Sequence, residues 1–144
     1  SWGGVNAISL AHHMQFDPRV PDTHKTVSKI VLLDAFQPVV AHNMAVPENV
    51  ESVLSIRHSQ ASRDDCSGEA PFGPYLGIAP VCSSSTSCAD FDVTAQPNTL
   101  YELDRIGYRR ADEIGHCLIP LVSHEPVLAY LNDQPYAHHL PAPQ

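Results

Sequence analysis

The sequence predicts an α/β protein built around a parallel sheet, and three patterns support this fold class. Residues 29–34 read KIVLLD, where four consecutive apolar residues follow a lysine and end at an acid, as in a strand buried on both faces of a parallel sheet. Residues 52–57 read SVLSIR, a second run with β-branched side chains and a polar end. Residues 3–14 repeat apolar side chains at three- and four-residue intervals, which indicates a helix.

The chain has 144 residues, enough for a single domain with a hydrophobic core, and it shows no internal repeat. Residues 59–99 are irregular and rich in Ser, Gly and Pro, and such long loops are usually functional or stapled by covalent bonds. The alternation in residues 91–94 predicts one short strand near the end of this loop. A short helix is expected over residues 126–131, followed by an extended tail over residues 132–144.

Composition excludes two classes of protein. The net charge is -8, with 8 Lys and Arg against 16 Asp and Glu, so a nucleic-acid partner is not expected because phosphate binding requires a basic surface. No apolar run reaches the length of a membrane-spanning helix, so we expect a protein that does not cross a membrane.

The cysteines predict disulfide bonds and an extracellular location. The chain contains Cys66, Cys82, Cys88 and Cys117, and the first three lie in the polar loop that cannot pack a core of its own. Disulfides persist in secreted proteins, whereas the alternative of free thiols would suit a cytosolic chain. No Cys and His residues have zinc spacing, so no metal site is expected. The sequence alone does not fix the pairing; our choice is Cys66 with Cys82 and Cys88 with Cys117.

A candidate catalytic motif lies at the start of the chain. Residues 1–4 read Ser-Trp-Gly-Gly and match the second half of G-x-S-x-G, a strained turn that requires small residues because a helix follows close to a strand. A helix, a strand ending at Asp34, a second strand, a long loop, His116 and a last helix then follow. Residues 32–35 (LLDA) look like the acid of lipases, and residues 115–120 (GHCLIP) resemble their histidine loop. The chain thus resembles the part of a lipase- or esterase-like α/β hydrolase that begins at the nucleophile.

This resemblance implies a role for four residues in a serine hydrolase that needs no cofactor. Ser1 would attack the carbonyl carbon of a small-molecule or lipid ester and form an acyl-enzyme. His116 would act as general base, and Asp34 would orient its imidazole. The backbone N–H of Trp2 would donate to the oxyanion.

Other residues compete for the roles of base and acid. His58 ends a predicted strand, and His124 lies near the last helix. The rival acids are Asp64, Asp65 and Asp92, of which the first two follow the second strand, where this family more often places its acid. We rank Asp34 first because it ends the clearest strand.

A complete α/β hydrolase has several strands before its nucleophile, and this sequence does not contain them. The resemblance therefore implies that a second chain, or an N-terminal half, completes the sheet. It also implies that the chain is a fragment or a processed product.

Two other functions remain as alternatives. Ser1 with its own α-amine as base would suit an N-terminal-nucleophile amidohydrolase, although such enzymes begin with a strand. The chain would otherwise be a non-catalytic extracellular binding or assembly module, since isolated Ser, His and Asp residues occur in most proteins.

Overall fold

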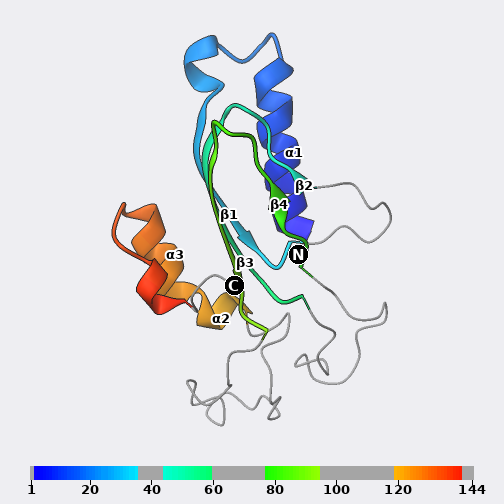
Figure 1. The fold of residues 1–144 in the computed structure, drawn as a ribbon. Coiled ribbons are helices and arrows are strands. Elements are labelled where there is room, and N and C mark those ends of the chain that lie inside the picture. Colours follow the sequence, from blue (N-terminus) through cyan, green and yellow to red (C-terminus); the bar gives the residue numbers. More distant parts are fainter. Residues whose placement is uncertain (1, 36–43, 60–76, 95–118, 141–144) are drawn as a thin grey trace.

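The computed structural model describes residues 2–35, 44–59, 77–94 and 119–140 (Figure 1). Its elements, in chain order, are α1 (Trp2–Phe16), η1 (Asp22–His24), β1 (Val27–Leu33), β2 (Met44–Ala45), β3 (Val50–Arg57), β4 (Pro80–Val81), β5 (Ser87–Asp92), α2 (Ile119–Val122), α3 (His124–Leu131) and η4 (Ala137–His139).

The main sheet has the strand order β1-β3-β5, and both of its strand pairings are parallel. Leu33 pairs with Ile56, and Arg57 pairs with Asp92, so the three strands end close together. A second parallel sheet consists of β2 and β4. The predictions of parallel strands near residues 29–34 and 52–57 are confirmed, as is the helix over 3–14.

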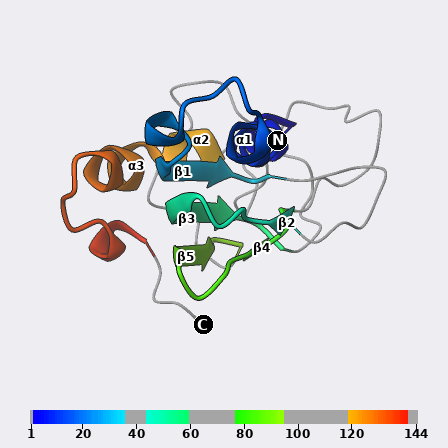
Figure 2. The ribbon, with the colours of Figure 1, turned by 90° about the horizontal axis from the view of Figure 1, so that it is seen from above.

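The main sheet is covered on both faces, with α1 on one side and α3 on the other (Figures 1 and 2). Ala11 of α1 packs in one core cluster with Ile30, Leu32 and Val53. The other cluster joins α2 and α3 to the opposite face, and its buried members are Leu54, Ile56, Phe91, Val93, Ile119, Val122, Tyr130 and Leu140. Burial on both faces explains why residues 30–33 are continuously apolar.

The C-terminal helix is held against the amino ends of the strands by polar contacts. Lys29 Nζ donates to the carbonyls of Tyr130 (2.9 Å) and Leu131 (3.2 Å) and pairs with Asp133 (2.5 Å). A cation at this place complements the partial negative charge at the carboxyl end of a helix. Tyr130 also donates its hydroxyl proton to Ser52 Oγ at 2.7 Å. In the tail expected to be extended, residues 137–139 form η4, and Leu140 is buried.

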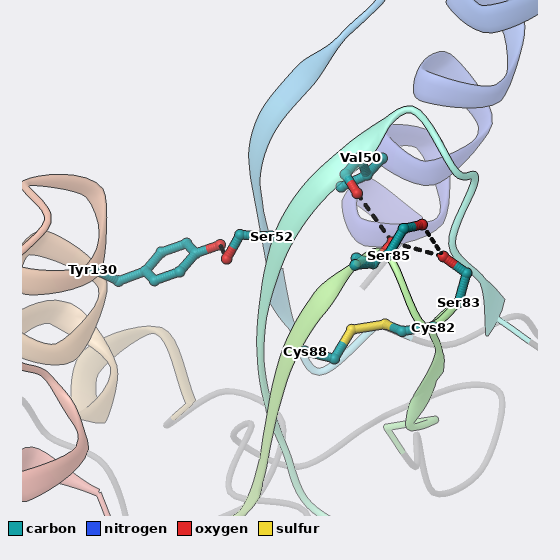
Figure 3. The surroundings of a disulfide bond; sticks show 8 residues. Val50, Ser52, Cys82, Ser83, Ser85, Cys88 and Tyr130 are labelled. Carbon is teal, nitrogen blue, oxygen red and sulfur yellow. Dashed lines mark hydrogen bonds between the residues drawn. A yellow bond between two sulfur atoms is a disulfide. The ribbon is translucent and has the colours of Figure 1, made fainter.

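A disulfide joins Cys82, just after β4, to Cys88 in β5, with 6.4 Å between the two Cα atoms (Figure 3). The prediction of at least one disulfide is confirmed, but the chosen pairing is wrong because neither cysteine bonds to Cys66 or Cys117, which lie outside the described residues. Cys82 and Cys88 bond to each other because a local turn brings them together. Thr86 Oγ1 donates to the carbonyl of Val50 (3.0 Å) and so holds the turn beside β3.

No helix in the described part of the chain is long and apolar enough to span a membrane.

The close approach of α1 to β1 depends on Gly4. A Cβ atom at this position would lie 2.5 Å from Ala35 Cβ and 3.4 Å from Leu32 Cδ2. We expect Gly4→Ala to lower the free energy of unfolding by about 1–3 kcal/mol, because α1 must move away from the strand. Gly3→Ala is the matched control, since Gly3 is exposed on the same helix and the substitution should be neutral or stabilise by up to about 1 kcal/mol. Urea unfolding measures both; equal stabilities would contradict this packing.

Candidate active site

Asp34 lies directly after β1 and is buried, with 1% of its surface exposed. Its main-chain N–H donates to the carbonyl of Ile56 at 2.8 Å, which fixes the chain at the end of β3. The residue has a φ of 47°, in the left-handed region that Asp and Asn adopt more readily than most residues. The strand therefore ends in a sharp turn that is anchored to its neighbour.

His58 follows the last residue of β3 and contacts Asp34 through two groups. Its main-chain N–H donates to Asp34 Oδ1 at 3.1 Å, and its ring Nδ1 lies 2.8 Å from the same oxygen. The side chains are 4% and 1% exposed, respectively. Because an ionised carboxylate can only accept, Nδ1 carries the proton when Asp34 is charged. The two donors compensate for the removal of the carboxylate from water.

Gly77 covers this pair where the chain returns to the sheet. Its N–H donates to the carbonyl of His58 at 2.9 Å, and the N–H of Ile78 donates to the carbonyl of Ala35 at 2.9 Å. A Cβ atom on Gly77 would collide with Asp34 Oδ1 and would lie 2.5 Å from Arg57 Cβ. The site consequently requires a glycine at this position.

The beginning of α1 lies at the same edge of the sheet. Trp2 is the first residue of the helix, and Gly4 contacts Ala35, the neighbour of Asp34. Figure 1 shows this end of α1 beside the carboxyl ends of the strands. A helix begins with unpaired N–H groups and a partial positive charge, which favour an anion. Helix start, carboxylate and imidazole thus gather where open α/β sheets place their sites.

A network of charged groups lies next to the pair. Arg57 binds Asp90 with Nε (3.1 and 3.0 Å) and Nη2 (2.9 Å), and Nη1 lies 3.5 Å from Asp92. Burial would raise the pKa of Asp92, but hydrogen bonds from Ser59 and Thr94 and the charge of Arg57 outweigh it and lower this pKa. Asp92, a rival for the acid, therefore contacts a guanidinium and hydroxyl groups, whereas Asp34 contacts an imidazole.

The predicted site residues fall into three groups. Asp34 is at a strand end, as expected, and Trp2 opens α1. Ser1, His116, Asp64 and Asp65 lie outside the described residues. The structure brings Asp34 into contact with His58, which the sequence predicted only as a rival for the base. The feature of the sequence that indicates this contact is a histidine at the end of a strand that runs parallel to the strand of Asp34.

The remaining rival, His124, begins α3 with a side chain that is 68% exposed, and its Nδ1 lies 3.6 Å from Glu125. A concavity of about 1040 Å³ lies away from the Asp34–His58 pair, at the opposite end of the sheet, where Lys29, Ser52 and Tyr130 line it. Within the described ranges, no three or more His, Cys, Asp or Glu residues are grouped to hold a metal ion.

Comparison with known proteins finds no matching family model, no matching curated protein and no matching solved structure.

Replacing Asp34 tests the buried pair. In Asp34→Ala, the two donors of His58 lose their acceptor in a buried place, so we expect unfolding to require about 2–4 kcal/mol less free energy. Asp133→Ala is the matched control, because Asp133 also has a positive φ (57°) but is 86% exposed. The control should lose about 1 kcal/mol or less, as expected for an exposed ion pair. Urea unfolding of both variants measures the difference, and equal losses would contradict a stabilising pair.

Proposed function

We propose that this chain carries the catalytic residues of a serine hydrolase that acts on esters through an acyl-enzyme. The observation that supports the proposal is the buried Asp34, hydrogen-bonded to an imidazole at the carboxyl edge of a parallel sheet. A buried carboxylate at this edge is suited to stabilise an imidazolium that forms during acyl transfer. The proposed triad is Ser1, His116 and Asp34.

In the first half of the reaction, Ser1 Oγ attacks the ester carbonyl carbon while His116 takes the hydroxyl proton. The carbonyl oxygen becomes an oxyanion, to which the N–H of Trp2 donates. The tetrahedral intermediate then expels the alcohol, which receives the proton from His116. In the second half, His116 takes a proton from water, the resulting hydroxyl attacks the acyl carbon, and the acid leaves as Ser1 recovers its proton.

The position of α1 supports the choice of nucleophile. Ser1 precedes Trp2 in the sequence, and Trp2 begins the helix whose start lies beside Ala35 and Asp34. The partial positive charge at the start of a helix favours the negative charge that develops in the transition state. The alternative amidohydrolase is less favoured because its class begins with a strand, whereas residues 2–16 are helical.

We further propose that the enzyme is secreted and acts on small-molecule or lipid esters. We also propose that another strand pairs with β1 at the edge of the sheet. The disulfide between Cys82 and Cys88 is of a kind that persists in oxidising compartments. β1 ends the order of the described sheet, and an apolar groove of about 480 Å³ runs between this strand and α1. Leu10, which lines the groove, is 60% exposed. An N-terminal half or a second chain would supply an apolar strand to cover this edge.

Labelling of the full-length protein with a fluorophosphonate probe tests the proposed function. The wild type should be labelled on Ser1, and Ser1→Ala should abolish the labelling. His116→Ala and Asp34→Asn should each lower kcat for ester hydrolysis by about 10³- to 10⁴-fold or more, because the base is lost or its imidazole is no longer oriented.

Ser9→Ala on α1 and His24→Ala in η1 are the matched controls, because both residues are exposed. Both should retain wild-type labelling. A correctly folded wild-type protein that shows no labelling and no ester hydrolysis would contradict the proposed function.

A further inference from the structure

We propose that the Cys82–Cys88 disulfide is a reducible clamp, which a dithiol reductant opens to release the segment that covers the buried Asp34–His58 pair. The covering segment is residues 77–82, which run from Gly77 through β4 to Cys82. This inference goes beyond the proposed function and does not depend on it, because it concerns the cover of the pair and not the reaction.

The covering segment contacts the main sheet at the place where the pair is buried. The N–H of Gly77 donates to the carbonyl of His58 at 2.9 Å. The N–H of Ile78 donates to the carbonyl of Ala35 at 2.9 Å. Gly77 also lies so close to Asp34 that a Cβ atom there would collide with Oδ1. Withdrawal of the segment would therefore admit water to two side chains that are now only 1% and 4% exposed.

The strand within the covering segment is too short to hold it in place alone. β4 consists of Pro80 and Val81, and it pairs with the two residues of β2. Val46 donates its N–H to the carbonyl of Val81 at 2.9 Å, whereas Pro80 has no N–H to donate. Isolated two-stranded pairings are at best marginally stable in water, so the segment needs a further attachment.

The disulfide supplies that attachment (Figure 3). Cys82 follows β4 directly, and Cys88 lies in β5, where it is the partner of Val53 on the central strand β3. Thr86 holds the turn between the two cysteines, because its hydroxyl donates to the carbonyl of Val50 at 3.0 Å. The bridge thus ties the end of the covering segment to the main sheet.

The two cysteines differ in exposure, which sets the order of thiol–disulfide exchange. Cys88 is exposed, whereas Cys82 is half-buried and packs against the core cluster that contains Ile30 and Val53. A thiolate of the reductant attacks Cys88 Sγ, the bond between the two protein sulfurs breaks, and Cys82 leaves as a thiolate. The second thiol of the reductant then displaces Cys88 from the mixed disulfide. The protein gains two electrons and two protons, and the dithiol becomes a disulfide.

Hydrogen exchange of main-chain amides, followed by NMR in the full-length protein, tests the clamp. The double variant Cys82→Ala/Cys88→Ala removes this bridge and leaves the other cysteines in place. We expect the amides of Gly77 and Ile78 to exchange at least about tenfold faster than in the wild type, because local opening of the segment loses its covalent restraint.

Reference amides and a control variant separate local opening from general destabilisation. Val93 and Val127 donate to the carbonyls of Arg57 and Ser123, outside the covering segment, so their exchange should change by less than about twofold. Ser84→Ala is the matched control, because Ser84 is exposed in the same turn and its substitution keeps the disulfide. This variant should exchange as the wild type does.

Reduction of the wild type by dithiothreitol tests the chemistry with every side chain in place, and it covers the case in which the double variant does not fold. Mass spectrometry of alkylated thiols should identify Cys82 and Cys88 as reduced while the protein remains folded. The amides of Gly77 and Ile78 should then exchange faster, as in the double variant.

Three outcomes would overturn the inference. The first is wild-type exchange at Gly77 and Ile78 in folded protein that lacks the bridge. The second is equal acceleration at Val93 and Val127, since the disulfide would then stabilise the whole fold and not the cover alone. The third is a bridge that dithiothreitol reduces only after the protein has unfolded. None of these measurements uses ester hydrolysis, so a failure of the proposed function is detected separately.

Discussion

The parallel pairing of β1 with β3 is the constraint on which the remainder of the structure depends. Because Leu33 pairs with Ile56, the residues that follow the two strands leave the sheet side by side. Asp34 turns back through a left-handed conformation, and the next turn of the chain after β3 presents His58 to it. Slipping the register by a single residue would reverse the faces of every strand residue and separate the pair.

The two helical layers stabilise this register from opposite sides. α1 can approach β1 closely because Gly4 has no side chain, and this approach also brings the start of the helix to the edge that holds Asp34. On the other face, Tyr130 and Lys29 connect α3 to the amino ends of the strands. Apolar contacts thus join the helices to the two faces of the sheet, while the polar contacts lie at the two ends of the strands.

Much of the fold could be predicted from sequence, because continuous apolar runs and helical spacing reflect burial directly. The position of Asp34 was predictable for the same reason, since it ends the clearest run. The contact between Asp34 and His58 could not be predicted from sequence, because it depends on a turn with positive φ at Asp34 and on the return of the chain at Gly77. The predicted disulfide pairing was wrong because the pairing depends on the turn before β5, where Thr86 donates a hydrogen bond to the carbonyl of Val50.

The short separation of Cys82 and Cys88 has a consequence for how the protein matures. Only six positions separate the two cysteines, so bringing them together costs little chain entropy compared with a bridge to the distant Cys66 or Cys117. Loops of about ten residues close within about 10–100 ns, far faster than a ribosome adds one amino acid. During synthesis, both thiols emerge before Cys117 does. Proximity therefore favours the pairing of Cys82 with Cys88 before the C-terminal helices have been synthesised.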